Sequence, residues 1–309
     1  MSNPLTLASN LSLKQLTYLL AIAETLNFTR AAEQCFVTQS TLSGGLAELE
    51  RQLGVKLVER DRQRVALTPI GQQVVNRARA LLAASVDLVR MTQESCDPHR
   101  GELHLGVIPT IAPFVLGRLL NLLRKACPDL SVAVRESQTH VLLEEVGKGE
   151  LDAALLALPI DAGKLLTLPL FDEVLQLVAH ADDPMAQRKN LKIDHIQEGQ
   201  LLLLEKGHCL RDHALATCSA QKAASIESHS VEATNLSTMV QLVNAGLGCA
   251  LLPDMAIRAG ILKGTKTVVL PLAKPVPKRT IALVTRASHP HLEFLRGQVL
   301  PVLMKCDQG

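Results

Sequence analysis

The first part of the chain carries apolar side chains at helical spacing. From Leu13 to Leu26, leucines and alanines recur every three or four positions, which predicts an amphipathic helix. The same spacing predicts a short helix from Phe28 and a third helix ending near Leu53, with Thr38 as the expected cap of the third. Short helices joined by a tight turn predict a helix-turn-helix, whose second helix can enter a DNA major groove.

Two β-like runs, 55–58 and 65–67, flank a polar tip after the third helix, which is typical of a wing. A plain solvated hairpin is the alternative interpretation. Hydrogen-bonding and basic side chains gather near the third helix and the wing, and such groups bind base edges and phosphates. The predicted contacts to double-stranded promoter DNA are Arg30, Gln39, Ser40, Thr41, Ser43, Arg60, Arg62 and Arg64.

Thr68 and Pro69 form a cap and first-turn pair that predicts the start of a long helix toward Ser95. The apolar positions of this helix follow a heptad-like seam: Val74, Ala78, Leu81 and Leu88. No neighbouring segment of the sequence supplies an obvious partner for the seam. We therefore predict dimerisation through this helix.

Strand-like and helical patterns alternate beyond residue 100. "ELHLGVI", "SVAVRES" and "LDAALLAL" predict strands, whereas "APFVLGRLLNLLRKA" and "HVLLEEVGKG" predict helices. A second set of such elements starts at "DEVLQLVAH", and "KRTIALVTR" with a final helix is expected to return to the first set. The alternation predicts an α/β fold with a largely parallel sheet and ligands at the carboxyl ends of its strands.

The chain is therefore expected to have three parts. Residues 1–68 form a winged helix-turn-helix domain, and residues 69–97 form a linker and dimerisation helix. Residues 101–309 form a two-lobed α/β regulatory domain, with one lobe at about 101–172 and 280–309 and the other at about 173–279. The turn-rich stretch "CDPHRG" supplies the boundary.

Composition narrows the class of protein. Apolar residues make up 47% of the chain, which is ample for buried cores, and no apolar run approaches the roughly 18 residues that cross a bilayer. A cytoplasmic protein without a membrane partner is expected. The net charge of +2 does not by itself indicate nucleic acid. Seven scattered cysteines do not suggest a disulfide scaffold.

Cys209 and Cys218 lie nine positions apart in the stretch "EKGHCLRDHALATC", whose polar residues predict a surface rather than a core. They could be structural thiols, zinc ligands together with His208 and His213, an enzyme nucleophile, or a redox switch. In a helix their α-carbons would lie roughly 13 to 14 Å apart, whereas a disulfide needs about 7 Å, so bonding them would unwind the segment. A preceding glycine, His208 and Arg211 favour a thiolate at Cys209.

The stretch from Leu13 to Gln72 closely resembles the DNA-binding module of LysR-type transcriptional regulators, with helices, turn, wing and linker helix in the family's order. The stretch from Gly101 to about Lys305 resembles the family's effector domain, two α/β lobes hinged like a periplasmic binding protein. The resemblance implies a transcriptional activator rather than an enzyme. It also implies contact with RNA polymerase and a homodimer that assembles into a homotetramer.

Five shorter motifs resemble the peroxide-sensing members of that family: "GVIPTIAP", "SQTH", "EKGHCLRDHALATC", "TMVQLVNAGLGCALLP" and "KPVPKRTIALV". This resemblance implies that Cys209 is the peroxidatic cysteine and Cys218 the resolving cysteine of a disulfide switch for hydrogen peroxide. It implies a peroxide pocket lined by Thr110, Thr139, His208, Asp212 and Arg279. No cofactor is expected, and glutaredoxin or thioredoxin is the expected reductant.

The main alternative is that the protein responds to a signal other than hydrogen peroxide. In that case the protein is a LysR-type regulator that responds to a small organic effector in the cleft between the lobes, and the two thiols are incidental. A thiol peroxidase and a metal sensor remain further alternatives, which peroxide turnover and metal analysis would distinguish.

Overall fold

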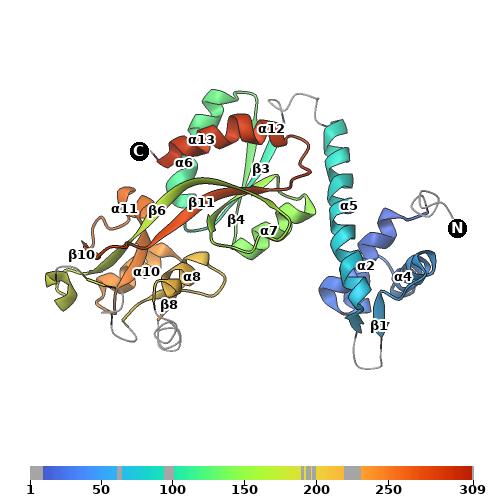
Figure 1. Cartoon of the computed structure of the whole chain (residues 1–309), viewed down its shortest axis with the longest axis horizontal. Helices are drawn as coiled ribbons and strands as arrows, with labels where there is room; N and C mark the ends of the chain where they lie inside the picture. The colour runs from blue at the N-terminus through green and yellow to red at the C-terminus, as the bar shows by residue number, and fades with distance from the viewer. Residues whose placement is uncertain are drawn as a thin grey trace. The chain divides into compact units, whose positions relative to one another are not determined.

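The computed structural model describes residues 10–60, 65–93, 101–188, 191–192, 196, 200–218 and 231–307 (Figure 1). The chain divides into two compact units, residues 1–93 with 147–149, and residues 94–146 with 150–309. The first unit has one apolar core, whereas the second has two.

The first unit contains α2 (Leu13–Thr25), α3 (Phe28–Gln34), α4 (Gln39–Leu53), β1 (Val58–Arg60), β2 (Val65–Leu67) and α5 (Pro69–Gln93). Leu19, Leu42 and Leu49 are fully buried at its centre, so the apolar positions at helical spacing form the core. Thr38 and Thr68 act as expected, because their hydroxyls accept backbone N–H groups at the starts of α4 and α5.

The wing begins later than its apolar run predicts. β1 starts at Val58 rather than Val55 and pairs antiparallel with β2. The Glu50 carboxylate accepts the backbone N–H groups of Leu57 (2.9 Å) and Val58 (3.2 Å), so α4 holds the intervening segment before pairing starts. The wing tip at residues 61–64 lies outside the described residues.

The first lobe of the second unit contains β3 (Glu102–Val107), α6 (Ala112–Ala126), β4 (Ser131–Glu136), α7 (Thr139–Lys148), β5 (Ala153–Leu158), β11 (Lys278–Thr285), α12 (Leu292–Phe294) and α13 (Leu300–Met304). β3 pairs in parallel with β4 and β5, whereas β11 runs antiparallel to β5. The prediction of a largely parallel sheet is wrong, because the chain re-enters this sheet along β11 in the opposite direction.

One long strand is shared by both lobes. β6 (Leu166–His180) pairs with β11 along its first part and with β9 and β10 along its second part (Figure 1). The sequence pattern predicted only the part from Asp172 onward. A continuous strand carries backbone hydrogen bonds from one lobe into the other, so the lobes share a sheet as well as the chain.

The second lobe contains β7 (Leu203–Leu204), α8 (Cys209–Ala216), β8 (Glu232–Ala233), α10 (Leu236–Asn244), β9 (Ala250–Pro253), α11 (Asp254–Arg258) and β10 (Thr267–Leu270). Its core is separate from that of the first lobe, and Phe114 packs against both cores. Among the described helices, none has the length and apolar character that crossing a bilayer requires.

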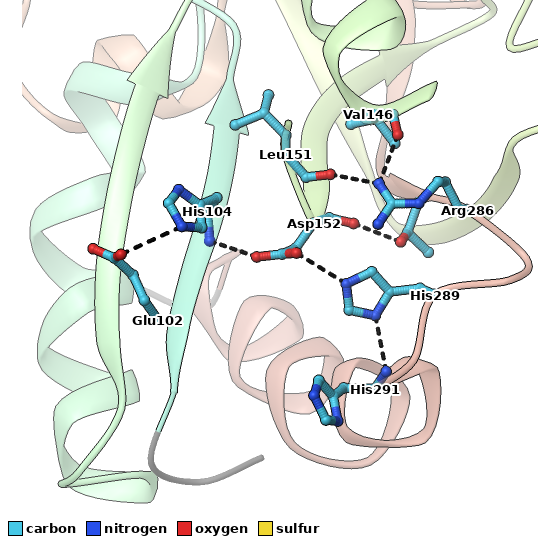
Figure 2. Close-up of polar contacts among 9 residues, drawn as sticks. Glu102, His104, Val146, Leu151, Asp152, Arg286, His289 and His291 are labelled. Atoms are coloured by element: carbon cyan, nitrogen blue, oxygen red, sulfur yellow. Dashed lines mark hydrogen bonds and ion pairs between the residues drawn. The ribbon is translucent and has the colours of Figure 1, made fainter. Parts of the chain in front are cut away.

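A buried polar cluster closes one end of the first lobe's sheet (Figure 2). The Asp152 carboxylate accepts the backbone N–H of His104 (2.7 Å) and lies 3.1 Å from Nε2 of His289. Arg286 donates to the carbonyls of Val146 (2.7 Å) and Leu151 (2.8 Å). These contacts join β3, α7 and β5 to the segment after β11, so the cluster has a structural role.

Candidate functional site

Cys209 lies where the two lobes of the second unit meet. It is the first residue of α8 in the second lobe, yet its side chain packs into the core of the first lobe and is only 7% exposed. Gly207 makes the turn before it with a φ of +99°, and a side chain there would collide with the amide of Gln138. Glycine therefore permits the close approach that brings Cys209 to the start of α7.

A buried ion pair lies close enough to Cys209 for its charge to act on the thiol. The Arg279 guanidinium on β11 donates to Glu173 of β6 at 2.8 Å, and neither side chain is more than 1% exposed. Arg279 also donates to the hydroxyl (2.8 Å) and the carbonyl (3.2 Å) of Thr110. The other Glu173 oxygen accepts the N–H of Met255 at 2.9 Å. The guanidinium is thereby held between β6 and the segment after β3, and α11 holds the carboxylate that it pairs with.

The remaining predicted pocket residues are Thr139 and Asp212, which act on the pKa of the thiol, and His208, which directly precedes Cys209. Burial raises the pKa of Cys209, and the Asp212 carboxylate raises it further, while the Arg279 charge and the Thr139 hydroxyl lower it. The Thr139 hydroxyl is buried, but its geometry falls short of a hydrogen bond with any described residue. His208 is buried just before α8, and burial lowers its pKa although Glu205 opposes the shift.

Two expectations about Cys209 are wrong. The polar residues around it do not form a surface, because His208, Arg211 and His213 are all buried. Arg211 does not favour a thiolate, since its guanidinium donates to the carbonyl of Leu204 (2.9 Å) and to Glu232 (2.6 Å). Burial outweighs the remaining positive charge, so the net pKa shift of Cys209 is upward.

Cys218 lies at the opposite end of α8 from Cys209. It follows the cap of α8, packs against the core of the second lobe, and its thiol lies 3.8 Å from the carbonyl of Ala214. Cys209 and Cys218 are both free thiols. Because the helix covers most of the segment between them, their α-carbons remain roughly 13 Å apart, beyond the reach of a disulfide.

His213 is a member of the site that the sequence suggested only as a zinc ligand. It lies one helical turn after Cys209, and both of its ring nitrogens are buried without a hydrogen-bond partner among the described residues. Burial, and then the Arg279 charge, lower its pKa to about 4. In the described part of the chain, no group of His, Cys, Asp or Glu side chains is arranged to hold a metal ion.

Glu173 is a second member of the site that the sequence pattern did not indicate. It stands in the run "DEVLQLVAH", where its charge looks like the polar face of a strand. A carboxylate within an apolar strand, opposite the basic "KR" of β11, was the available signal. Only the register, which pairs Arg279 with Glu173, reveals the ion pair.

The predicted DNA contacts lie mainly at the start of α4. Gln39, Ser40 and Thr41 are exposed there, and the Thr38 hydroxyl contacts the hydroxyls of both Ser40 (2.9 Å) and Thr41 (2.8 Å). Ser43 is half-buried one turn further along the helix. These positions face outward from the first unit's core.

The basic contacts are only partly described. Arg30 is exposed on α3, and the backbone of Arg60 ends β1. Arg62 and Arg64 lie outside the described residues. Among the predicted contacts, the side chains that the structure describes are therefore the polar ones of α4 and that of Arg30.

Comparison with known families agrees with this architecture. Residues 13–72 match the bacterial regulatory helix-turn-helix proteins of the lysR family, and residues 97–297 match the LysR substrate binding domain. The chain belongs to the LysR family. The predicted fold class, a winged helix-turn-helix followed by a two-lobed α/β domain, is confirmed, and the LysR helix-turn-helix implies DNA binding.

Individual relatives cover nearly the whole chain. The HTH-type transcriptional regulator EstR of Acinetobacter baylyi is 46% identical, covering 90% of this LysR protein and 92% of its own length. OxyR of Escherichia coli, a DNA-binding transcriptional dual regulator, is 39% identical over 91% of both chains. The "Hydrogen peroxide-inducible genes activator" of Dickeya chrysanthemi is also 39% identical, over 93% of this chain and 92% of its own.

Solved structures of OxyR proteins are similar as well. A full-length OxyR variant from Pseudomonas aeruginosa superposes with a TM-score of 0.66 at 33% identity, covering 96% of this chain and 95% of its own. A hydrogen-peroxide-bound OxyR variant from Corynebacterium glutamicum has a TM-score of 0.63 at 32% identity, covering 96% and 92%.

Proposed function

We propose that this LysR protein senses hydrogen peroxide at Cys209 and regulates transcription in response. The observation that carries the proposal is the position of this thiol at the start of α8, near the buried Thr139 hydroxyl and the charge of Arg279, both of which lower its pKa. A molecule consisting only of hydrogen-bond donors and acceptors suits such groups. Relatives named as peroxide-inducible activators support the same function.

The chemistry has two balanced steps. The Cys209 sulfur attacks one oxygen of peroxide, the O–O bond breaks, and the products are a sulfenic acid and water. The Cys218 sulfur then displaces the hydroxyl from that sulfenic acid, which forms the disulfide and releases a second water. Because the pKa of Cys209 is raised, the Arg279 charge and the Thr139 hydroxyl have to stabilise the thiolate when it forms.

The second step requires α8 to unwind. Cys209 packs in the core of one lobe and Cys218 against the core of the other, so a bond between them must pull at least one thiol from its core. Unwinding of α8, which contacts β5 of the first lobe and β7 of the second, would alter how the lobes meet other subunits. We propose dimerisation through α5, assembly to a tetramer, contact with RNA polymerase, and reduction by glutaredoxin or thioredoxin.

Thiol mapping by mass spectrometry after a stoichiometric peroxide pulse tests this function. We expect a Cys209–Cys218 disulfide in the full-length protein and a stable sulfenic acid at Cys209 in Cys218→Ser. Cys249→Ser, which removes another buried thiol, is the control and should oxidise like the wild type. An unmodified Cys209, or a bond from Cys209 to another cysteine, would contradict the proposal.

A LysR regulator of a small organic effector is the second candidate. It is favoured by one observation: EstR, whose name does not refer to peroxide, is 46% identical to this chain, whereas the peroxide-inducible activator of Dickeya chrysanthemi is 39% identical. In a Cys209→Ser, Cys218→Ser double variant, transcription that still responds to an effector would support it. Loss of all regulation in that variant would support peroxide sensing.

A further inference from the structure

Phe36 is the most exposed large apolar side chain described in this protein. It lies in the turn between α3 and α4 and is 96% exposed. Its φ is +55°, in the left-handed region that bulky residues rarely adopt. Burying a phenylalanine side chain is normally favourable, so an exposed one in an unfavourable backbone conformation needs a cause.

The turn itself does not require this ring. The backbone closes the turn, because the N–H of Phe36 donates to the carbonyl of Glu33 (3.1 Å) and the N–H of Val37 donates to the carbonyl of Ala32 (3.0 Å). A left-handed residue at this point is ordinarily glycine, asparagine or aspartate, which adopt the conformation at lower cost. The local fold would therefore be more stable with a smaller residue.

The position of Phe36 suggests what the ring contacts. It lies three residues before the start of α4 and is close in sequence to the exposed Gln39, Ser40 and Thr41. In helix-turn-helix proteins the first residues of the second helix reach the base edges in the major groove. The Thr38 hydroxyl between them caps α4, so the ring is the large side chain that this turn offers to DNA.

We propose that Phe36 contacts DNA through the apolar surface of the duplex, at a thymine methyl group or the face of a neighbouring deoxyribose. The thymine methyl is an apolar feature of the major groove, and phenylalanine is one of the side chains that contact it. The contact adds shape and apolar recognition to the polar side chains of α4. It depends on the LysR helix-turn-helix and not on peroxide sensing.

The experiment uses the reduced full-length protein and a duplex that it selects from a random-sequence library. Phe36→Ala should bind this duplex about ten-fold more weakly, which corresponds to about 1.4 kcal/mol. Phe36→Asn should lose a similar factor while keeping or raising the melting temperature, because asparagine tolerates the left-handed conformation. A purely structural role for the ring would instead lower the melting temperature of Phe36→Asn.

Leu26→Asn is the matched control. Leu26 also has a positive φ (+46°) and is exposed, but it lies at the other end of α3. We expect unchanged DNA affinity in this variant. Equal affinity of the wild type and both Phe36 variants would overturn the proposal, as would a drop in the melting temperature of Phe36→Asn.

Uracil substitution identifies the surface that the ring contacts. Replacing thymines of the selected duplex by uracil one at a time removes single methyl groups and leaves the base pairing intact. One position whose methyl matters to the wild type and not to Phe36→Ala assigns the contact to that methyl. Weaker binding by Phe36→Ala without any such position assigns it to deoxyribose, which also supports the proposal.

Discussion

Single buried charges determine the geometry around the Cys209 thiol. Arg279 is held by Glu173 and Thr110, and its charge acts on both Cys209 and His213. The same guanidinium therefore lowers the pKa of the thiol and opposes protonation of the imidazole. At this scale the site consists of groups whose protonation depends on one another, and each can be tested by a single substitution.

Replacing Arg279 should destabilise the fold strongly. Arg279→Gln leaves the Glu173 carboxylate buried without its cation, so the free energy of unfolding should fall by about 3 to 5 kcal/mol. Urea unfolding at neutral pH measures it. Lys278→Gln is the control, because the adjacent Lys278 pairs with an exposed Asp172 and should lose less than about 1 kcal/mol. Equal losses would contradict the buried-pair interpretation.

His213 should make the stability of the protein depend on pH. Its folded pKa of about 4 lies below the usual 6.5, so the unfolded chain binds a proton in this interval and the folded chain does not. The stability is fully present above about pH 6.5 and declines as the pH falls toward 4, by up to about 3 kcal/mol in all.

Urea unfolding at pH 7.5 and pH 5 measures this dependence. We expect His213→Leu to have a smaller difference between the two pH values than the wild type. His140→Leu removes an exposed histidine of α7 and should keep the wild-type difference. An unchanged difference in His213→Leu would show that other groups cause the dependence.

At the scale of elements, β6 holds the two lobes together, whereas α8 is the element between them that can change its conformation. β6 is continuous and pairs with strands of both lobes, which ties the lobes together. α8 is short, carries Cys209 at its start, and ends just before Cys218. A short helix between two cores can unwind at lower cost than a strand paired along both edges.

Oxidation should therefore expose Arg211 to protease. In the wound helix this side chain is 3% exposed and bound to Leu204 and Glu232. If the Cys209–Cys218 bond unwinds α8, trypsin should cleave after Arg211 at least ten-fold faster in the oxidised protein. Mass spectrometry of the fragments measures the rate, and peroxide-treated Cys218→Ser is the control. Equal cleavage before and after oxidation would mean that α8 stays wound.

At the scale of the whole molecule, α5 is the last helix of the first unit, and its apolar side chains differ in how far they are buried. Ala78 is buried against the helix-turn-helix core, whereas Leu81 and Leu88 are more than half exposed. The predicted seam therefore divides into a part used within the chain and a part that a second copy could cover.

Charges at the exposed part of this seam should prevent dimerisation. We expect the wild type to be at least a dimer at micromolar concentration, and Leu81→Glu with Leu88→Glu to be a monomer, because burying two carboxylates in the seam is unfavourable. Light scattering measures the mass. Asn76→Glu adds a charge at an exposed position of the same helix and should not change the mass. A dimeric double variant would place the interface elsewhere.

Local patterns in the sequence determined the elements and the family. The spacing of apolar residues predicted α6 as observed and the helices of the first unit closely, because amphipathic periodicity is a property of neighbouring residues. Caps such as Thr38 were predictable for the same reason. The spacing of Cys209 and Cys218 along one helix was likewise readable from the chain.

Tertiary structure alone decided the environments of the functional groups. The polar neighbours of Cys209 suggested a surface thiolate, but the meeting of two lobes buries it and raises its pKa. Glu173 became a partner of Arg279 only through the register of β6 and β11, strands that are 106 positions apart at this pair. Burial and charge pairing depend on distant segments, and a pattern of neighbouring residues does not contain them.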